Sequence, residues 1–197
     1  TERALIKQSV QLLEEAGARV GKEVSGFREP ARQAVELSVD LLEKGALDVS
    51  DDDALESHLF RLLQIAPQQA GLFVGRPDGS FVYVSRGNEP GQFRTKTIRA
   101  SETGAQLVWR DGSFSVLRRA TDPADTYDPR TRPWYNAAEL GRGSVWTDPY
   151  VFFTSQRPGL TVANPVYDGP DLIAVVGADI EIEVLSLLLS DVRDTDA

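Results

Sequence analysis

The 197-residue sequence contains no cysteine, no methionine and a single histidine, His58. Without cysteine, the chain cannot form disulfides, use a thiolate nucleophile, or hold zinc or an iron–sulfur cluster through thiolates. A single histidine excludes a metal site with two histidine ligands and argues against a Ser–His–Asp triad. Because no methionine is present, not even an initiator, we expect the chain to begin within a longer gene product.

Basic residues are fewer than acidic ones, and long apolar runs are missing. Thirty acidic against 21 basic residues give a net charge of −9, which disfavours a nucleic-acid-binding surface because phosphate binding needs clustered Lys and Arg. No segment reaches the roughly 20 apolar residues of a membrane span. The motifs of P-loop, dinucleotide-binding, serine-hydrolase and zinc-protease sites are missing. We therefore expect no enzyme activity, no catalytic residue, no metal and no cofactor.

What the sequence does contain begins with helical periodicity over the first 47 residues. Apolar side chains recur every three or four positions at Ile6, Val10, Leu13, Ala16, Val20, Val24 and Phe27. Pro30 starts or kinks a second stretch that ends at Gly45. Two interpretations stay open: a kinked helix or two-helix hairpin packed on a sheet, or a signalling stalk that forms a dimer interface.

A further helix is expected after this region. Ser50 or Asp51 provides its N-cap, and apolar positions continue to Ile65. His58 lies on this helix, where we expect a surface or packing residue. After Pro67 the apolar period changes from that of a helix to that of a strand.

Short antiparallel strands follow, interrupted by one irregular segment. We expect strands at 71–75, 81–85, 92–99, 105–110, 114–119, 150–154, 160–167 and 172–180, an insert rich in Pro, Asp and Arg at 121–143, and a closing helix at 182–189. Helices followed by runs of antiparallel strands predict an α+β fold. One face of the sheet should meet the helices, and the insert should cover the other face over a concave space.

The segment most informative about function is Tyr127-Asp128-Pro129-Arg130-Thr131-Arg132-Pro133-Trp134-Tyr135. Pro133 suits the first position of a helix, so Arg132 should stand at a helix N-terminus, where backbone N–H groups favour an anion. A guanidinium beside such donors forms a carboxylate clamp, and the aromatic residues add the walls of a small-molecule pocket. The alternative is a structural Arg, Asp and aromatic cluster that pins a loop. We expect Arg130 to be structural or on the surface.

Two other segments contribute candidate residues. Residues 146–155 include Tyr150 and Phe152, and the strand Val175–Ile180 is apolar except for Asp179. A buried carboxylate needs a cationic or hydrogen-bonding partner. Asp179 therefore either caps the final helix or binds an ammonium group of a ligand.

These three segments resemble those of the Cache family, the extracytoplasmic PAS-like sensor domains of bacterial receptors. The similarity covers roughly residues 1–190 in element order: a long N-terminal helix, strands, Tyr-x-x-x-x-Arg-x-Trp-Tyr, then Pro-Tyr, and a strand ending in Gly-x-Asp-Ile. The resemblance implies a PAS-like antiparallel sheet with a long N-terminal helix, a helical insert between strands and a short C-terminal helix. It divides the chain into a helical region (1–66), a sensor module (67–190) and a tail leading to a membrane span (191–197).

The resemblance also implies a function. Residues Tyr127, Arg132, Trp134, Tyr135 and Asp179 fall where the amino-acid-binding subgroup keeps its ligand residues, and Tyr150 and Phe152 complete the predicted pocket. The ligand would be an amino acid or a simple organic acid. The domain would be the extracytoplasmic part of a membrane receptor, with membrane helices on both sides and a chemotaxis transducer, histidine kinase or nucleotide cyclase as output. The N-terminal helix would form a homodimer.

Two departures from the family pattern bear on the ligand. The chain ends one short helix after Asp179 and so looks like a single module, whereas amino-acid-binding members usually stack two. Phe152 stands where some amino-acid binders have an acidic residue, which makes a simple carboxylate a competitor of an amino acid. The alternative function is a ligand-free dimerisation or protein-interaction module, in which Leu13 and Val20 would contribute to the interface.

Overall fold

The computed structural model describes residue 26 and residues 28–183. The expected dimer interface on the first 25 residues and the tail at 191–197 lie outside the described residues, and so does almost all of the closing helix expected at 182–189. None of the described helices is long and apolar enough to cross a membrane.

Two helices pack on one face of the sheet. The N-terminal helix is described over residues 28–43, and α2 spans Asp52–Ile65. Asp51 caps α2, because its carboxylate accepts a hydrogen bond from Ala54 N at 2.9 Å. His58 Nε2 lies 2.8 Å from Ser38 Oγ between the two helices, which confirms the expected packing role of this histidine.

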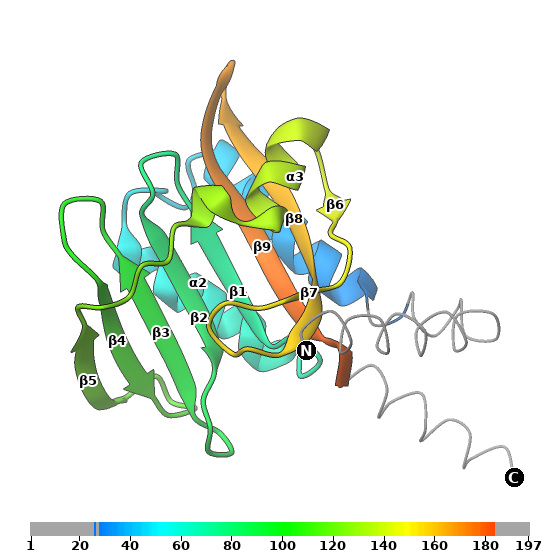
Figure 1. Ribbon diagram of the computed structural model, residues 1–197. Helices are drawn as coiled ribbons and strands as arrows, with labels where there is room; N and C mark the ends of the chain where they lie inside the picture. The colour runs from blue at the N-terminus through cyan, green and yellow to red at the C-terminus, as the bar shows by residue number, and fades with distance from the viewer. Residues whose placement is uncertain (1–25, 27, 184–197) are drawn as a thin grey trace, which may run out of the picture.

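The described residues form a nine-stranded sheet in which every pairing is antiparallel. The strands are β1 (Gly71–Gly75), β2 (Phe81–Arg86), β3 (Phe93–Ile98), β4 (Ala105–Arg110), β5 (Val116–Asp122), β6 (Val145–Trp146), β7 (Tyr150–Val151), β8 (Pro158–Asp168) and β9 (Asp171–Glu181). Their spatial order is β5-β4-β3-β2-β1-β9-β8-β6, with β7 also paired to β8. The predicted α+β fold is confirmed (Figure 1).

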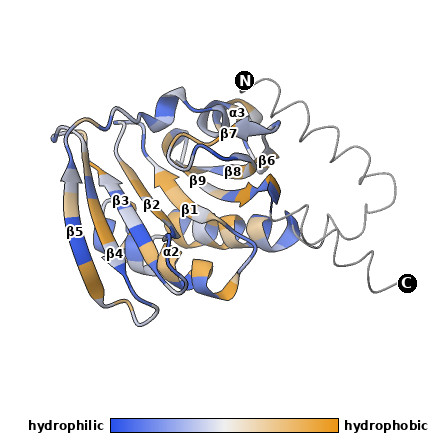
Figure 2. Ribbon diagram, turned by 60° about the horizontal axis from the view of Figure 1, so that its bottom comes forward, coloured by the Kyte–Doolittle hydropathy of each residue, from blue (hydrophilic) through white to orange (hydrophobic). Residues whose placement is uncertain are grey.

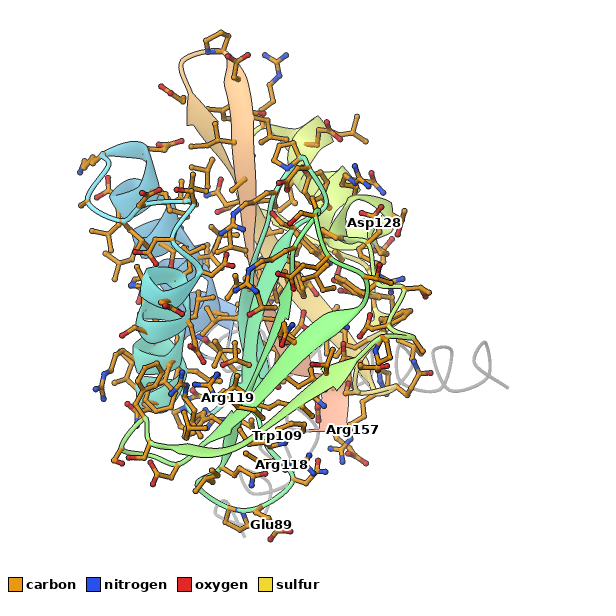
Figure 3. All side chains as sticks on the ribbon, turned by 90° about the vertical axis from the view of Figure 1, so that its left-hand side faces the viewer. Glu89, Trp109, Arg118, Arg119, Asp128 and Arg157 are labelled. Atoms are coloured by element: carbon orange, nitrogen blue, oxygen red, sulfur yellow. The ribbon has the colours of Figure 1, made fainter. Side chains whose placement is uncertain are left out.

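The insert between β5 and β6 covers the other face of the sheet. It contains the short 3-10 helix η1 (Pro129–Thr131) and the helix α3 (Pro133–Gly141), which crosses β8 and β9 (Figure 1). Figure 3 shows the sheet from the side, with the N-terminal helix and α2 on one face of the strands and the insert on the other.

Each face of the sheet has its own core. On the helix side, aliphatic residues of the N-terminal helix, α2 and the strands form one large cluster. On the insert side, a smaller cluster is mostly aromatic and consists of Phe73, Phe81, Tyr83, Trp134, Tyr135, Ala138, Ala163 and Val175. Figure 2 shows the hydrophobic colour concentrated on β1, β2 and α2, while β5 carries a long hydrophilic stretch. Four of the predicted pocket residues belong to this aromatic cluster or pack against it: Tyr127, Trp134, Tyr135 and Tyr150.

Two glycines give the aromatic rings room to lie against the sheet. A Cβ on Gly177 would lie 2.2 Å from the Phe73 ring, and a Cβ on Gly159 would lie 2.0 Å from the Phe152 ring. Both distances are too short for a contact between carbon atoms that are not bonded to each other. A side chain at either position would therefore displace a ring of the insert-side layer.

The prediction of a strand at 150–154 is wrong beyond Val151, where β7 ends. The chain turns there instead: Gln156 N donates to Phe152 O, Phe152 N donates to Arg157 O, and Gln156 has a φ of 57°. The apolar run of this segment belongs to a loop that folds the Phe152 side chain inward. The short strand β6 was not expected from the sequence either.

Candidate functional site

A small cavity lies between the sheet and the insert. Its lining combines strands, insert and the β7–β8 loop: Phe73, Phe81, Tyr83, Tyr127, Arg132, Trp134, Tyr150, Phe152, Phe153, Thr154 and Asp179. Its volume, taken as the space open to the centre of a water molecule, is about 20 Å³, room for about one water. Six of the seven predicted site residues line it; Tyr135 does not.

Arg132 stands at the N-terminus of α3, as the position of Pro133 predicted. Its backbone is extended (φ −90°, ψ 147°), and its side chain makes no capping hydrogen bond to the helix. The guanidinium carbon lies 5.7 Å from the Tyr127 ring centre and 5.5 Å from that of Phe153. Among the described residues no carboxylate lies within ion-pairing distance of this guanidinium. Its charge is therefore held between two aromatic rings at the cavity wall.

The neighbouring Arg130 has a different role. It forms an ion pair with Asp128 at 2.7 Å on the exposed side of the insert, and its Nη1 donates to Pro77 O at 3.4 Å. This confirms the expectation that Arg130 is structural or on the surface. The nonapeptide thus contains both a loop-pinning pair and a separate arginine that faces the cavity.

Tyr127 and Trp134 are joined by a hydrogen bond. Trp134 Nε1 donates to Tyr127 Oη at 3.3 Å. Burial raises the pKa of the Tyr127 phenol well above its ordinary value, so Tyr127 stays protonated at neutral pH. Because its oxygen accepts from Trp134, its own proton is free to be donated into the cavity.

Asp179 lies at the floor of the cavity in the middle of the sheet. Only 6% of the residue is exposed, and its Oδ1 accepts a hydrogen bond from Thr161 Oγ1 at 2.6 Å. The Tyr150 hydroxyl lies 2.7 Å from Thr161 Oγ1 and donates to it, since the Thr161 proton is already directed at Asp179. Burial raises the pKa of Asp179 to about 7, with the nearby negative charge of Glu181 adding to the effect.

Among the described residues, Asp179 does not take the alternative role of capping the final helix. The strand β9 continues through Glu181, and the carboxylate bonds to a side chain of β8 rather than to a helix N-terminus. Asp179 is paired in register with Gly71 and Thr161, and Gly71 has no side chain to cover it. The carboxylate therefore stays accessible to the cavity.

The remaining predicted residues fill or support the site. The Phe152 ring packs edge-on against Tyr150, with ring centres 5.2 Å apart, and closes one side of the cavity. Tyr135 is buried behind Trp134, with ring centres 5.5 Å apart and an interplanar angle of 65°. Tyr135 thus supports the tryptophan instead of facing the cavity, and burial raises the pKa of its phenol to about 12.

Sequence reasoning missed several lining residues. Phe73, Phe81 and Tyr83 share one face of β1 and β2, with Phe73 and Tyr83 directly opposed. Their alternate spacing was a usable signal, because residues two apart on a strand face the same side. Phe153 and Thr154 were missed because the segment was expected to be a strand.

A buried lysine also borders the site. Lys96 on β3 is 2% exposed, and its Nζ lies 2.5 Å from Asp125 Oδ2 in the insert. The same ammonium lies 4.7 Å from the Tyr127 ring centre. Burial lowers the pKa of Lys96, and the ion pair with Asp125 opposes that shift. The pair ties the insert to the sheet beside the cavity.

Comparison with known proteins matches this architecture. A family model described as the first PDC sensor domain of methyl-accepting-chemotaxis-protein-like receptors matches residues 81–186. Adenylate cyclase 1 of Rhizobium meliloti is 28% identical over 145 residues, 66% of this chain and 22% of that protein. Methyl-accepting chemotaxis protein PscA of Pseudomonas syringae is 40% identical over 83 residues, 42% of this chain and 13% of that protein. The chain thus spans less than a quarter of the length of these relatives.

Solved structures share the fold. The ligand-binding domain of the Campylobacter jejuni chemoreceptor Tlp3, in complex with L-valine, aligns with a TM-score of 0.59 at 14% identity, covering 95% of this chain and 64% of that chain. The ligand-binding domain of the Pseudomonas fluorescens chemoreceptor CtaA, in complex with L-isoleucine, gives 0.57 at 17% identity, covering 93% and 61%. The resemblance to Cache sensors, the PAS-like fold and the expectation of a sensor rather than an enzyme are confirmed. Because the family model covers more than half of the chain, this protein belongs to the family of first PDC sensor domains of methyl-accepting-chemotaxis-protein-like receptors.

Proposed function

We propose that the domain senses a small molecule carrying a carboxylate, and that an α-amino acid fits its cavity better than a simple organic acid does. One observation carries the proposal. Arg132 and Asp179 line the same cavity with opposite charges, yet neither is paired with an ionic partner among the described residues. A zwitterion that bridges them would satisfy both charges.

The carboxylate would bind at the insert side of the cavity. The Arg132 guanidinium offers a bidentate fork, and Tyr127 offers the phenolic proton that its bond from Trp134 leaves free. The first turn of α3 adds backbone N–H groups that have no acceptor within the helix. These donors surround one end of a ligand.

The ammonium would bind at the sheet side. Asp179 has one hydrogen bond, from Thr161, and room for further donors on its remaining lone pairs. Tyr150 and Phe152 surround this end with aromatic surface. At pH values below the pKa of Asp179 the same group is a neutral donor, which would suit an organic acid with a polar group in place of the amine.

Ligand entry requires the β7–β8 loop to move. The cavity now has room for about one water molecule, so Phe152 or Phe153 would have to leave it. Phe153 is 39% exposed and rests edge-on against Tyr127, with ring centres 5.2 Å apart. We propose that ligand binding selects a form in which this loop is displaced, and that the change in loop and insert is the signal.

The proposal is tested by calorimetric titration with three matched compounds. L-Valine carries both charges, 3-methylbutanoate lacks the amine and isobutylamine lacks the carboxylate. A thermal-shift screen of the common amino acids first identifies the side chain that fits, and the matched set is then rebuilt on that side chain. We expect the amino acid to bind at least about tenfold more tightly than either analogue. Equal affinities for the amino acid and the amine-free acid would refute the role of Asp179.

Amino-acid binding should also depend on pH. Asp179 has a pKa of about 7 in the ligand-free domain, raised by burial and Glu181 and lowered by Arg132. A bound ammonium lowers this pKa, so binding releases a proton at pH values below 7 and affinity rises with pH. We expect the affinity to increase about tenfold from pH 6 to pH 8 and to level off above that. The amine-free analogue should show no such increase in the same titrations.

The receptor context follows as part of the same proposal. We propose that the domain is the extracytoplasmic part of a bacterial membrane receptor, organised as the helical region 1–66, the sensor module 67–190 and the tail 191–197. Its output would be a chemotaxis transducer, a histidine kinase or a nucleotide cyclase, and its N-terminal helix would pair with that of a second copy. In the described part of that helix, the apolar side chain of Leu37 faces solvent. A residue of a dimer interface would be exposed in this way when one copy is viewed alone.

A further inference from the structure

A second hollow lies on the same face of the sheet, next to the cavity. It is a groove of about 830 Å³, measured as the space open to the centre of a water molecule, and it shares Tyr83 and Thr154 with the cavity. Its lining is polar and rich in arginine. We call it the arginine groove and define it by Gln69, Arg94, Trp109, Arg118 and Arg157.

Three of these residues form one row across the sheet. Arg94 on β3 lies directly opposite Trp109 on β4, which lies directly opposite Arg118 on β5. Directly opposed residues of antiparallel strands point to the same face. Since neighbouring strands are about 4.8 Å apart, the Cα atoms of the two arginines lie about 10 Å apart, with the tryptophan on the strand between them.

The two arginines of this row are free to bind an anion. In the part of the chain that the structure describes, neither Arg94 nor Arg118 forms an ion pair or a side-chain hydrogen bond. Arg118 lies over Trp109, with its guanidinium carbon 3.7 Å from the ring centre, so the ring holds it in place. Two arginines in one row, both without an ionic partner among the described residues, are notable in a chain with a net charge of −9.

The other arginines of the groove are engaged. Arg157 pairs with Glu181 at 3.0 Å, so the carboxylate of the groove is already neutralised. Arg86 donates to the backbone carbonyls of Leu63, Ala66 and Gln69 and thereby caps the end of α2. Because Arg86 and Arg157 are engaged in these contacts, Arg94 and Arg118 are the arginines of the groove that remain to bind an anion.

Gln69 supplies an independent sign of a ligand. It is 1% exposed, and both polar atoms of its side-chain amide, Nε2 and Oε1, are buried without a hydrogen-bond partner among the described residues. A buried amide with no partner destabilises the folded protein, because it has lost its hydrogen bonds to water and gained none in exchange. Because Gln69 lines the groove, a bound polar molecule would supply the missing partner.

We propose that the arginine groove is a second ligand site, for a small organic molecule that carries at least two carboxylate or phosphate groups. One anionic group binds Arg94 and the other binds Arg118. Gln69 lies beyond Arg94 at the β1 end of the row, where its amide donates to a further polar group of the ligand. A monovalent acid has a single anionic group and so cannot bind both arginines at once. This site does not depend on the cavity, because none of the groove residues that bind the anion lines it.

Citrate and inorganic pyrophosphate serve as probes, with acetate as the monovalent comparison at equal ionic strength. Binding is measured by calorimetry and by tryptophan fluorescence, since Trp109 lies in the row. The matched pair of variants is Arg118→Gln and Arg119→Gln, which remove the same charge from adjacent residues of β5. Arg119 lines a separate hollow on the α2 side of the sheet (Figure 3).

We expect Arg118→Gln and Arg94→Gln to weaken citrate or pyrophosphate binding at least about tenfold, and Arg119→Gln to change it by less than about twofold. Circular dichroism checks that the variants fold. Equal losses of affinity in Arg118→Gln and Arg119→Gln would overturn the proposal, because the loss would then come from the change in net charge and not from a specific site. So would the absence of polyanion binding up to about 10 mM. Loss of citrate binding in Arg132→Ala would also overturn it, because the anion would then sit in the cavity.

Discussion

Asp179→Asn is expected to make the ligand-free domain more stable at pH 8 and to weaken its affinity for an amino acid strongly. Burial raises the pKa of Asp179 from its ordinary value of 3.8 to about 7. Between these values the folded protein keeps the proton that the unfolded chain releases, so the free energy of unfolding falls as pH rises from about 4 to 7. Above pH 7 the full penalty of a buried, unpaired carboxylate is present.

Asparagine keeps the shape of aspartate but carries no charge, so it removes this penalty. We expect a gain in unfolding free energy of about 2–4 kcal/mol at pH 8, and a rise in melting temperature of roughly 5–10 °C for a domain of this size. Thermal melts at pH 8 and pH 5 measure it. The gain should shrink at pH 5, where wild-type Asp179 is already protonated.

The exposed Asp168→Asn in the β8–β9 hairpin is the matched control, and it should leave the melting temperature unchanged at both pH values. In the same Asp179→Asn protein, amino-acid affinity should fall at least about 100-fold, because an ammonium loses the one buried carboxylate that lines the cavity among the described residues. A stability gain of equal size at pH 5 and pH 8 would show that the charge of Asp179 is not its cause. A domain that is stabilised by losing a carboxylate retains it at the expense of stability, as binding sites do.

The fold was largely predictable because it depends on local patterns. Alternating apolar residues located the main strands, and the position of Pro133 was enough to place Arg132 at a helix N-terminus. Asp179 stood out because it interrupts an apolar strand, and a charge there must face something other than a hydrophobic core. Such signals come from residues that are close together in the sequence.

The features that escaped prediction depend on contacts between distant segments. The inward turn at Phe152 requires the space that Gly159 leaves on β8, and the burial of Lys96 requires Asp125 from the insert. Tyr135 was expected in the pocket because it belongs to the aromatic motif that resembles the ligand motif of the family, but on a helix adjacent residues such as Trp134 and Tyr135 point in different directions. The arginine row also depends on the register of three strands, which the sequence of any one strand does not reveal.

Arg132→Ala is expected to lower the affinity for the carboxylate ligand at least about 100-fold while leaving the fold intact. The loss is large because Tyr127 and the helix N-terminus offer only neutral donors in place of the guanidinium. The fold should survive because, among the described residues, the guanidinium contacts aromatic rings and no ionic partner. Arg132→Lys should recover part of the affinity, since lysine keeps the charge but not the bidentate geometry.

Arg130→Ala is the control that the sequence itself supplies. It lies two residues away in the same loop and loses the same charge, but its partner is Asp128 on the exposed side. We expect it to change ligand affinity by less than about twofold. Calorimetry on the three variants, with the amino acid and its carboxylate-free amine, separates the effects: Arg132→Ala should weaken only the ligand that carries a carboxylate. If the amino acid bound Arg132→Ala as tightly as the wild type, the carboxylate would bind elsewhere in the domain and the assignment of this cavity would be wrong.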